Sequence, residues 1–259
     1  MGWQIFVHSF RQVFGNLGGA LRVSALLTIV QVGVMMTIGK EMMVDQETMM
    51  RMMQTGAFPW GRMVIVWIVL LVTWLWIAVG WHRFVLLEEE ASVVPPLRVD
   101  RMLGYLGKSI LITLLLMVVA VPLGMVAGML IGPMLVKATS GGAAIFALGL
   151  FALVVYLPLA VIGLRLSSVL PGVALEPGMP LFKGWEATRG QTGTILILAV
   201  ILVAFSIGLQ YLASLAFTDP FSLPAIVLNG VVQWFVGMVG VSILTTLYGH
   251  YIEGRALRV

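Results

Sequence analysis

The sequence contains no cysteine, only three histidines and few charged residues, which make up 10% of its 259 positions. The absence of cysteine excludes disulfide bonds, thiolate catalysis and cysteine-ligated metals. Because globular domains carry about 25% charged residues, the low charge content argues against a water-soluble domain. Hydrophobic residues instead make up 60% of the chain, which is typical of an integral membrane protein.

Six long apolar runs account for this composition. Each run is long enough to cross the ~30 Å hydrocarbon core of a bilayer as a helix. The runs cover residues 23–39, 63–81, 109–134, 143–164, 194–217 and 225–248. We therefore predict an all-α integral membrane protein, a six-transmembrane-helix bundle that forms a single transmembrane domain over residues 1–259.

The basic residues are distributed unequally between the two sides that the spans define. Eleven of the 15 Lys and Arg residues fall in the N-terminal arm, the second loop, the fourth loop and the C-terminal tail. The positive-inside rule then predicts that both termini of this multi-pass protein lie in the cytoplasm. The chain has a net charge of +4, and its excess of basic residues lies on the cytoplasmic side, where it meets anionic headgroups. We therefore expect membrane lipids, and no nucleic acid, as partners.

Short amphipathic segments precede the odd-numbered spans, at residues 10–19, 101–108 and 185–193. Such segments are typical of helices that lie in the membrane interface. Their regular recurrence indicates three tandem units, each made of an interfacial helix and a two-span hairpin. Any protein built from hairpins with basic cytoplasmic loops would show a similar pattern, so that alternative stays open.

The patterns that carry common enzyme chemistry are missing. There is no His-x-x-Glu-His, Gly-x-Ser-x-Gly or Walker A pattern, and the histidines His8, His82 and His250 lie far apart. The span interiors hold essentially no ionisable side chain, which ion-coupled transport would require. We expect no enzymatic activity, no catalytic residue, no cofactor and no metal centre.

Aromatic and basic side chains mark the predicted cytoplasmic ends of the spans. They fit the headgroup region, where aromatic rings sit and basic side chains snorkel. Arginines at this level could also grip lipid phosphates through paired N–H donors. The candidate lipid- or headgroup-binding residues are Arg83, Arg165, Arg189, Trp81 and Trp185.

Methionines are concentrated in the first loop, which is predicted to be external. The stretch 40–54 has no Pro or Gly and predicts a helix that carries Asp45, Glu47 and Arg51. Thioethers suit Cu(I), but the loop has no His or Cys, and Met also serves as an adaptable residue at interaction surfaces. We therefore prefer a partner-binding helix to a copper site, with the candidate residues Met42, Met43, Met49, Met50, Met52 and Met53.

A few uncharged residues stand out inside the spans. Asn229 and Gln233 are four residues apart and share one face of the sixth span, where they could bond across helices or contact a small polar ligand. Gly124, Gly128 and Gly132 form a stripe of small residues on the third span, which predicts close helix packing.

Two neighbouring segments carry a family resemblance. Residues 163–176 read GLRLSSVLPGVALE and residues 182–190 read FKGWEATRG. An Arg, a Pro and an acid, followed by an aromatic-centred helix with Thr-Arg-Gly, resemble uncharacterised six-span proteins of the YciC-like family. They also resemble the membrane domain attached to some glycerophosphoryl diester phosphodiesterases. The resemblance implies a bacterial inner-membrane location and a six-helix fold without an established activity, because the phosphodiesterase barrel is absent here.

The leading function hypothesis is a non-enzymatic scaffold or accessory subunit that packs against a membrane-protein partner. It depends on the scarcity of ionisable groups in the spans and on the Met-rich loop. One alternative is a passive transporter or phospholipid-handling protein that uses the arginine rim. A second alternative is a copper-handling protein that uses the Met cluster.

Overall fold

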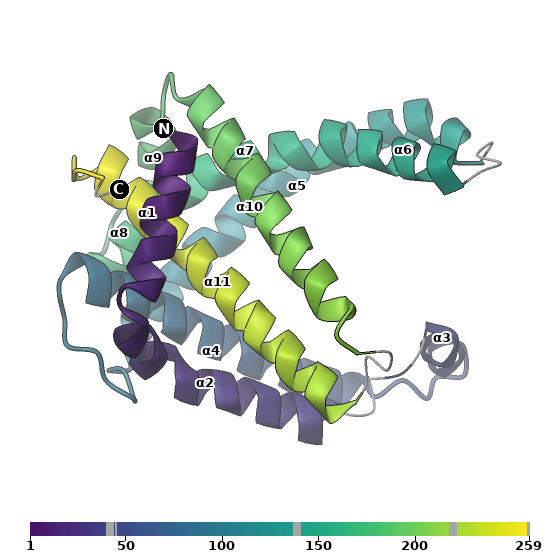
Figure 1. Ribbon diagram of the computed structural model, residues 1–259, viewed down its shortest axis with the longest axis horizontal. Helices are drawn as coiled ribbons and strands as arrows, with labels where there is room; N and C mark the ends of the chain where they lie inside the picture. The colour runs from purple at the N-terminus through teal and green to yellow at the C-terminus, as the bar shows by residue number, and fades with distance from the viewer. Residues whose placement is uncertain (40–43, 45, 137–140, 218–221, 258–259) are drawn as a thin grey trace. The chain divides into compact units, whose positions relative to one another are not determined.

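The computed structural model describes residues 1–39, 44, 46–136, 141–217 and 222–257, and within these ranges it contains helices and no strand (Figure 1). Lipid offers no hydrogen-bond partner to a backbone, so apolar runs of this kind cross it as helices. The elements are α1 (Gly2–Phe14), α2 (Leu17–Thr37), α3 (Gln46–Gln54), α4 (Trp60–Leu86), α5 (Val99–Val136), α6 (Gly141–Phe151), the π-helix η2 (Ala152–Tyr156), α7 (Leu157–Ser167), α8 (Leu170–Leu175), α9 (Lys183–Ala187), α10 (Thr192–Ser214) and α11 (Leu223–Tyr251).

Six helical segments of the described chain are long and apolar enough to cross a membrane, as the apolar runs predicted. The all-α, six-span architecture of a multi-pass membrane protein is therefore confirmed. Large apolar side chains lie exposed on these helices; Val118, Met129 and Leu130 of α5 are each 71% exposed. Exposed apolar surface of this kind is expected where a helix faces lipid tails. The spans are Leu17–Thr37, Trp60–Leu86, Val99–Met134, Gly149–Leu175, Thr192–Ser214 and Leu223–Tyr251.

The segments before the odd-numbered spans differ from one another. The amphipathic α1 is a separate helix before the first span, and the short α9 precedes the fifth. Residues 101–108 instead form the first part of the continuous 38-residue helix α5, so the separate interfacial helix expected there does not exist. At about 1.5 Å per residue, α5 is longer than the ~30 Å hydrocarbon core requires.

The fourth span is interrupted in its middle. The α-helical hydrogen bonding of α6 gives way to the π-helix η2, and α7 then begins with Pro158 in its first turn. Proline has no N–H to donate, and its ring opposes the carbonyl four residues earlier, which here lies in η2. A single wider turn is a common way for a helix to accommodate such a disruption.

The chain divides into two compact units. Unit 1 comprises Met1–Ser9, Leu103–Val203 and Ile243–Val259, and unit 2 comprises Phe10–Met102 and Ala204–Ser242. The fourth span and all of the third except Val99–Met102 belong to unit 1, and the first two spans belong to unit 2. Helices α10 and α11 each contribute residues to both units. This division does not follow three consecutive two-span units, so the tandem repeat stays a prediction, as does the single domain.

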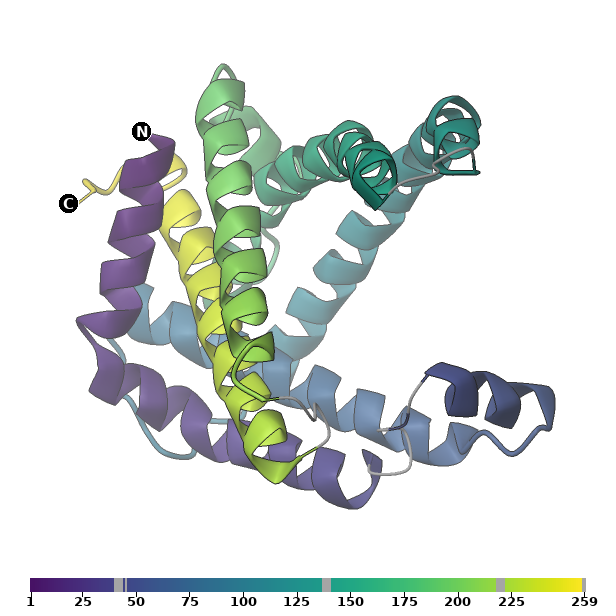
Figure 2. The same cartoon turned by 45° about the vertical axis from the view of Figure 1, so that its right-hand side comes forward.

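Unit 2 is built around α2 and α4, which lie side by side (Figures 1 and 2). A Cβ atom added at Gly19 of α2 would lie 2.5 Å from Cζ of Phe84 on α4. A Cβ atom added at Gly237 of α11 would lie only 2.0 Å from Cη2 of Trp74 on α4. Glycine at these two positions therefore allows aromatic rings of α4 to pack directly against neighbouring helices.

Unit 1 has its own packing contacts. Its helices α5 and α6 meet through Ala127, Ile131 and Ala147, which are 1%, 4% and 0% exposed. At Gly172 of α8, an added Cβ would lie 2.6 Å from Cε2 of Tyr248. Small side chains at these places allow the helices of unit 1 to approach closely.

Candidate functional site

Arg83, a candidate headgroup-binding residue, is buried near the end of α4 and holds Glu89. Its Nε donates to the two carboxylate oxygens of Glu89, over 3.1 and 3.0 Å, and its Nη2 also donates to Oε1. Arg98 donates to the same Oε1 over 3.1 Å. The hydrogen bond from Arg83 is the main reason that the pKa of the Glu89 carboxyl is lowered. The donors that would grip a lipid phosphate thus already hold a carboxylate of the same unit.

Arg165 is 7% exposed and joins α7 to α9 within unit 1. Its Nε donates to Oγ1 of Thr188 over 3.0 Å, and its Nη2 donates to the carbonyl oxygens of Trp185 and Thr188 over 3.1 and 3.2 Å. The guanidinium carbon lies 3.9 Å from the centroid of the Trp185 ring. The last carbonyls of a helix have no partner within it. Arg165 therefore caps α9 with a planar group that both donates and stacks.

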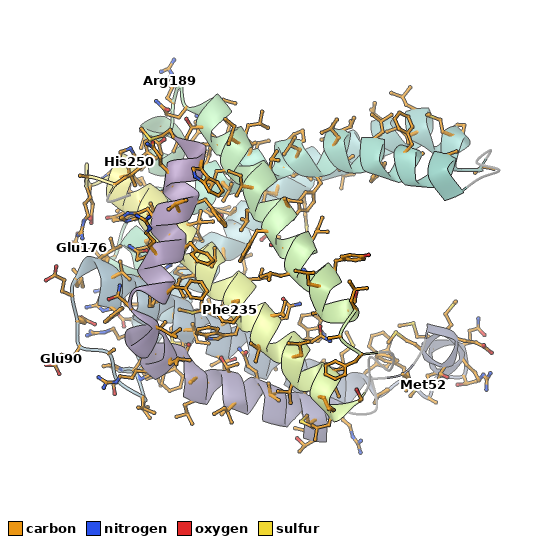
Figure 3. All side chains as sticks on the ribbon, viewed as in Figure 1. Met52, Glu90, Glu176, Arg189, Phe235 and His250 are labelled. Carbon is orange, nitrogen blue, oxygen red and sulfur yellow. The ribbon has the colours of Figure 1, made fainter. Side chains whose placement is uncertain are left out.

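The segment that carries the family resemblance thus surrounds one buried arginine. A Cβ atom added at Gly184 would lie 2.6 Å from the carbonyl oxygen of Arg165. Trp185 keeps 38% of its surface exposed. Arg189 is exposed in the turn before α10, where its side chain points away from the helices (Figure 3). Arg165 and Arg189 lie in unit 1 and Arg83 in unit 2, and their role in headgroup binding stays a prediction.

Trp81, the remaining headgroup candidate, is fully buried in unit 2. Its ring centroid lies 5.5 Å from that of Phe84. Its indole N–H has no hydrogen-bond partner within the described part of the chain. The ring therefore presents no surface to a headgroup in this structure.

The Met-rich segment forms the nine-residue helix α3. Met42 and Met43 lie outside the described residues. At about 100° per residue, the thioethers of α3 share one side of the helix, and the charged residues Glu47 and Arg51 share the other. Arg51 Nη2 and Glu47 Oε1 are 3.0 Å apart and exposed. Figure 3 shows Met52 on this helix; the full set on α3 is Met49, Met50, Met52 and Met53.

Some polar side chains inside the helices bond to one another, often across long stretches of sequence. Such bonds satisfy polar groups that lipid cannot satisfy, and they tie helices together. In unit 2 they join Gln31 Nε2 to Thr73 Oγ1 over 2.7 Å, Trp234 Nε1 to Ser24 Oγ over 2.7 Å and Ser242 Oγ to Gln12 Oε1 over 2.6 Å; in unit 1 they join Ser9 Oγ to Thr246 Oγ1 over 2.8 Å.

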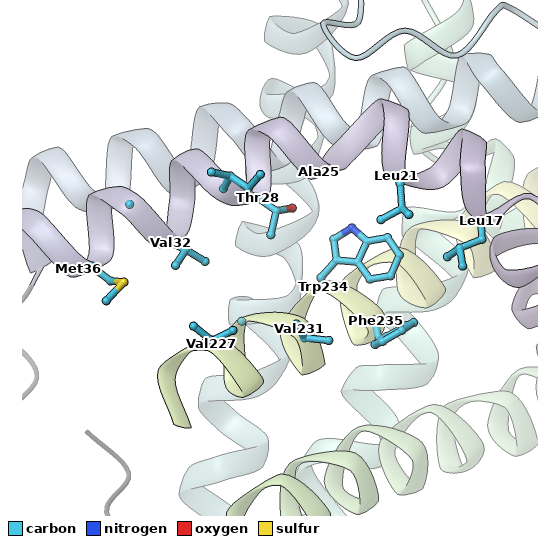
Figure 4. A pocket seen from close by; sticks show the side chains of 13 residues that line it. Leu17, Leu21, Ala25, Thr28, Val32, Met36, Val227, Val231, Trp234 and Phe235 are labelled. Carbon is cyan, nitrogen blue, oxygen red and sulfur yellow. The ribbon is translucent and has the colours of Figure 1, made fainter. Parts of the chain in front are cut away.

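Two hollows open between the spans of unit 2. The first, here called the apolar groove, has a volume of about 630 Å³ and lies between α2 and α11. Figure 4 shows Val227, Val231 and Phe235 of α11 along one wall, with the indole of Trp234 between the two helices. All of its lining residues are uncharged. A groove of this kind at membrane depth is suited to hydrocarbon.

The second hollow, here called the amide cleft, has a volume of about 520 Å³ and lies between α2, α4 and α11. Asn229 and Gln233 line it together, as their four-residue spacing predicted. Both are exposed, and neither side chain forms a hydrogen bond to any residue that the structure describes. Gln31 and Thr28 bring a further amide and a hydroxyl from α2. This cleft therefore brings polar groups of α2 and α11 to one open space.

No protein-family model, curated protein or solved structure matches this chain. The resemblance to the YciC-like family stays a prediction. Among the described residues, no group of three or more His, Cys, Asp or Glu side chains could hold a metal ion. The sequence singled out Asn229 and Gln233 but missed Gln31 and the cleft wall Trp74. A lone amide in an otherwise apolar run was the available signal for Gln31.

Proposed function

We propose that this chain is a non-enzymatic accessory subunit of a membrane complex in a bacterial inner membrane. Helix α3 contacts a membrane-protein partner on the side opposite the two cytoplasmic termini. The supporting observation is that α3 carries its methionines on one side and its charged residues on the other. Met50 and Met53 are 51% and 50% exposed. Flexible thioethers adapt to irregular partner surfaces, and apolar side chains gathered on an exposed helix are typical of interaction sites.

A supporting role also agrees with the hydrogen bonding inside the units. Arg83 holds the loop after α4 through Glu89, and Arg165 caps α9. The bonded pairs within the helices, such as Gln31 with Thr73, join neighbouring spans. These arrangements favour a fixed framework on which another protein assembles.

Co-purification from native membranes in mild detergent tests this proposal. The double variant Met50→Ser, Met53→Ser should lose most of a stoichiometric partner, because burying each thioether side chain contributes about 1.5–3 kcal/mol. The matched control is Glu47→Gln, Arg51→Gln, which removes the ion pair from the other side of α3 and should keep the partner. Unchanged recovery in the Met variant, or equal loss in the control, would refute the proposal.

The same preparation separates the alternatives. Copper that is bound stoichiometrically and lost in the Met variant would favour copper handling, because thioethers are soft ligands. A specific phospholipid that is lost on Arg189→Gln, with no protein partner, would favour phospholipid handling through an exposed guanidinium.

A further inference from the structure

We propose that the apolar groove of unit 2 holds one acyl chain of an anionic phospholipid. The phosphate of this lipid pairs with Arg22 of α2, at the end of the groove nearest α1, and Arg11 of α1 adds a second positive charge there. Neither arginine is among the headgroup-binding candidates that the sequence pointed out. This inference goes beyond the accessory role of α3 and does not depend on it.

The groove itself takes hydrocarbon. Two hydrogen-bonding side chains, Thr28 and Trp234, are among its lining residues. The Thr28 hydroxyl donates to the carbonyl oxygen of Ser24 over 3.0 Å, and the Trp234 indole donates to Oγ of Ser24 over 2.7 Å. A polar head placed here would find no free side-chain donor, which is unfavourable, whereas an acyl chain needs none.

Arg22 lies on the groove side of α2. It comes three residues before Ala25 and seven before Ile29, which both line the groove, and these spacings place side chains on one side of a helix. Arg22 is the sixth residue of the span Leu17–Thr37. From this depth its long apolar stem carries the guanidinium to the level of the headgroups. There its paired N–H donors match the oxygens of a phosphate.

The positive charge at this end of the groove has no counter-ion in the described chain. Arg22 and Arg11 are exposed, and neither forms a hydrogen bond or an ion pair with any residue that the structure describes. Residues 1–39 contain no Asp or Glu. Arg83 and Arg165, in contrast, are already bonded within the chain. Basic side chains at the membrane surface attract anionic lipids, and these two arginines are free to do so.

Helix α1 adjoins the same end of the groove. Phe14 of α1 stacks on Phe235 of the groove wall, with ring centroids 5.3 Å apart (Figure 4 shows Phe235 beside Leu17). Arg11 comes three residues before Phe14, and residues three apart are neighbours on a helix surface. Two positive charges without an acid favour a head group with a net negative charge. A zwitterionic head would add an ammonium group, which the guanidinium groups repel.

The bilayer sets how far the chain reaches along the groove. Half of the ~30 Å hydrocarbon core is about 15 Å, which corresponds to about ten residues of α2 at 1.5 Å per residue. A chain whose phosphate is held by Arg22 therefore ends near Val32. The lipid occupies the half of the groove that contains Ala25 and Ile29, and it ends before Met36.

Photo-cross-linking of the full chain in phosphatidylcholine vesicles tests the proposal. The probe is trace phosphatidylglycerol with a diazirine at the end of one acyl chain. It should label α2 most strongly near Ile29 and Val32, and more weakly at Met36. Arg22→Gln should reduce the labelling about tenfold, the loss expected for one charge-assisted hydrogen bond. Arg22→Lys should retain part of it, because an ammonium binds phosphate as a point charge.

Matched variants separate this site from the general attraction of lipid to a basic surface. Arg189→Gln removes an exposed arginine of unit 1 and should leave the labelling of the groove unchanged. This control also separates the site from phospholipid handling through Arg189. Ala25→Phe should block the groove, whereas Ala204→Phe, at an exposed position of α10 that lines neither hollow, should not.

Three results would overturn the proposal. The first is equal labelling of the wild type and the double variant Arg11→Gln, Arg22→Gln. The second is equal labelling by a phosphatidylcholine probe with the same diazirine chain, which would show that the groove meets only bulk lipid. The third is complete disulfide dimerisation of Ile29→Cys in native membranes, a clean test because the chain has no other cysteine. That outcome would show that a second copy covers the groove.

Discussion

Replacement of Gly237 by alanine tests the contact between α11 and α4 that forms one wall of the amide cleft. The added Cβ would lie 2.0, 2.7 and 3.0 Å from Cη2, Cζ3 and Cζ2 of Trp74. Non-bonded carbon atoms ordinarily lie about 3.5–4.0 Å apart. The ring or the helix must therefore move by about 1.5 Å, and Trp74 is displaced at the place where it lines the cleft.

The magnitude follows from two opposing effects. Inserting a methyl group into a packed contact costs about 1–3 kcal/mol, whereas alanine is favoured over glycine inside a helix by roughly 0.5–1 kcal/mol. Gly240 lies one turn further along α11, and a Cβ there would meet nothing within 4 Å. Gly240→Ala thus carries the helix effect without the clash. The free energy of unfolding should be about 1–3 kcal/mol lower for Gly237→Ala than for Gly240→Ala.

The assay is reversible unfolding by sodium dodecyl sulfate in mixed micelles, and near-ultraviolet circular dichroism monitors the transition. A repeat in a Trp74→Leu background completes a double-mutant cycle, and there the penalty of Gly237→Ala should disappear. Equal stability of the Gly237 and Gly240 variants would refute the packing argument. A penalty that persists without the Trp74 ring would show that the clash lies elsewhere.

Two further predictions concern the buried arginines. The folded state lowers the pKa of Glu89 below its ordinary 4.5, so its carboxylate stabilises the fold fully above that pH, and the contribution is lost as the pH falls through the lowered value. In the wild type the melting temperature should therefore fall as the pH drops from about 5 to about 3. Glu89→Gln should make this pH dependence weaker, and Glu90→Gln should leave it unchanged. Arg165→Lys should lower the free energy of unfolding by about 1–3 kcal/mol, because an ammonium cannot reproduce the three bonds of the guanidinium. Arg189→Lys, at an exposed position, should change it by less than about 0.5 kcal/mol in the same assay.

Hydropathy predicted the spans because the bilayer permits one local solution for a long apolar run. It located their ends less well, since an end depends on contacts outside the run. The fourth helix of the fold, α4, continues past Trp81 to Leu86, and Arg83 in this last part is held by Glu89 from the following loop. Residues 101–108 join α5 because no proline or cap interrupts the helix there.

The pairing of polar groups across helices was not predicted. Ser242 bonds to Gln12 across 230 positions of sequence, and Ser9 bonds to Thr246 across 237. Nothing in the local pattern around any of these residues names its partner, because the pairing depends on which helices the fold brings together. Asn229 and Gln233 were found because both lie on one helix, where spacing alone fixes a shared face. That Gln31 of α2 lines the same cleft as these two amides could be seen only in the structure.

The glycine stripe shows why spacing alone does not predict packing in a membrane protein. A Cβ at Gly124, Gly128 or Gly132 would meet no atom within 4 Å among the described residues, so the predicted close contact is absent there. At Gly19 and Gly237 an added Cβ would lie within 2.5 Å of an aromatic ring. In water an exposed apolar stripe is costly and tends to find a partner, but lipid tails are as apolar as leucine and remove that drive. A glycine in a span therefore indicates a contact only where a bulky residue lies opposite, as Phe84 and Trp74 do on α4.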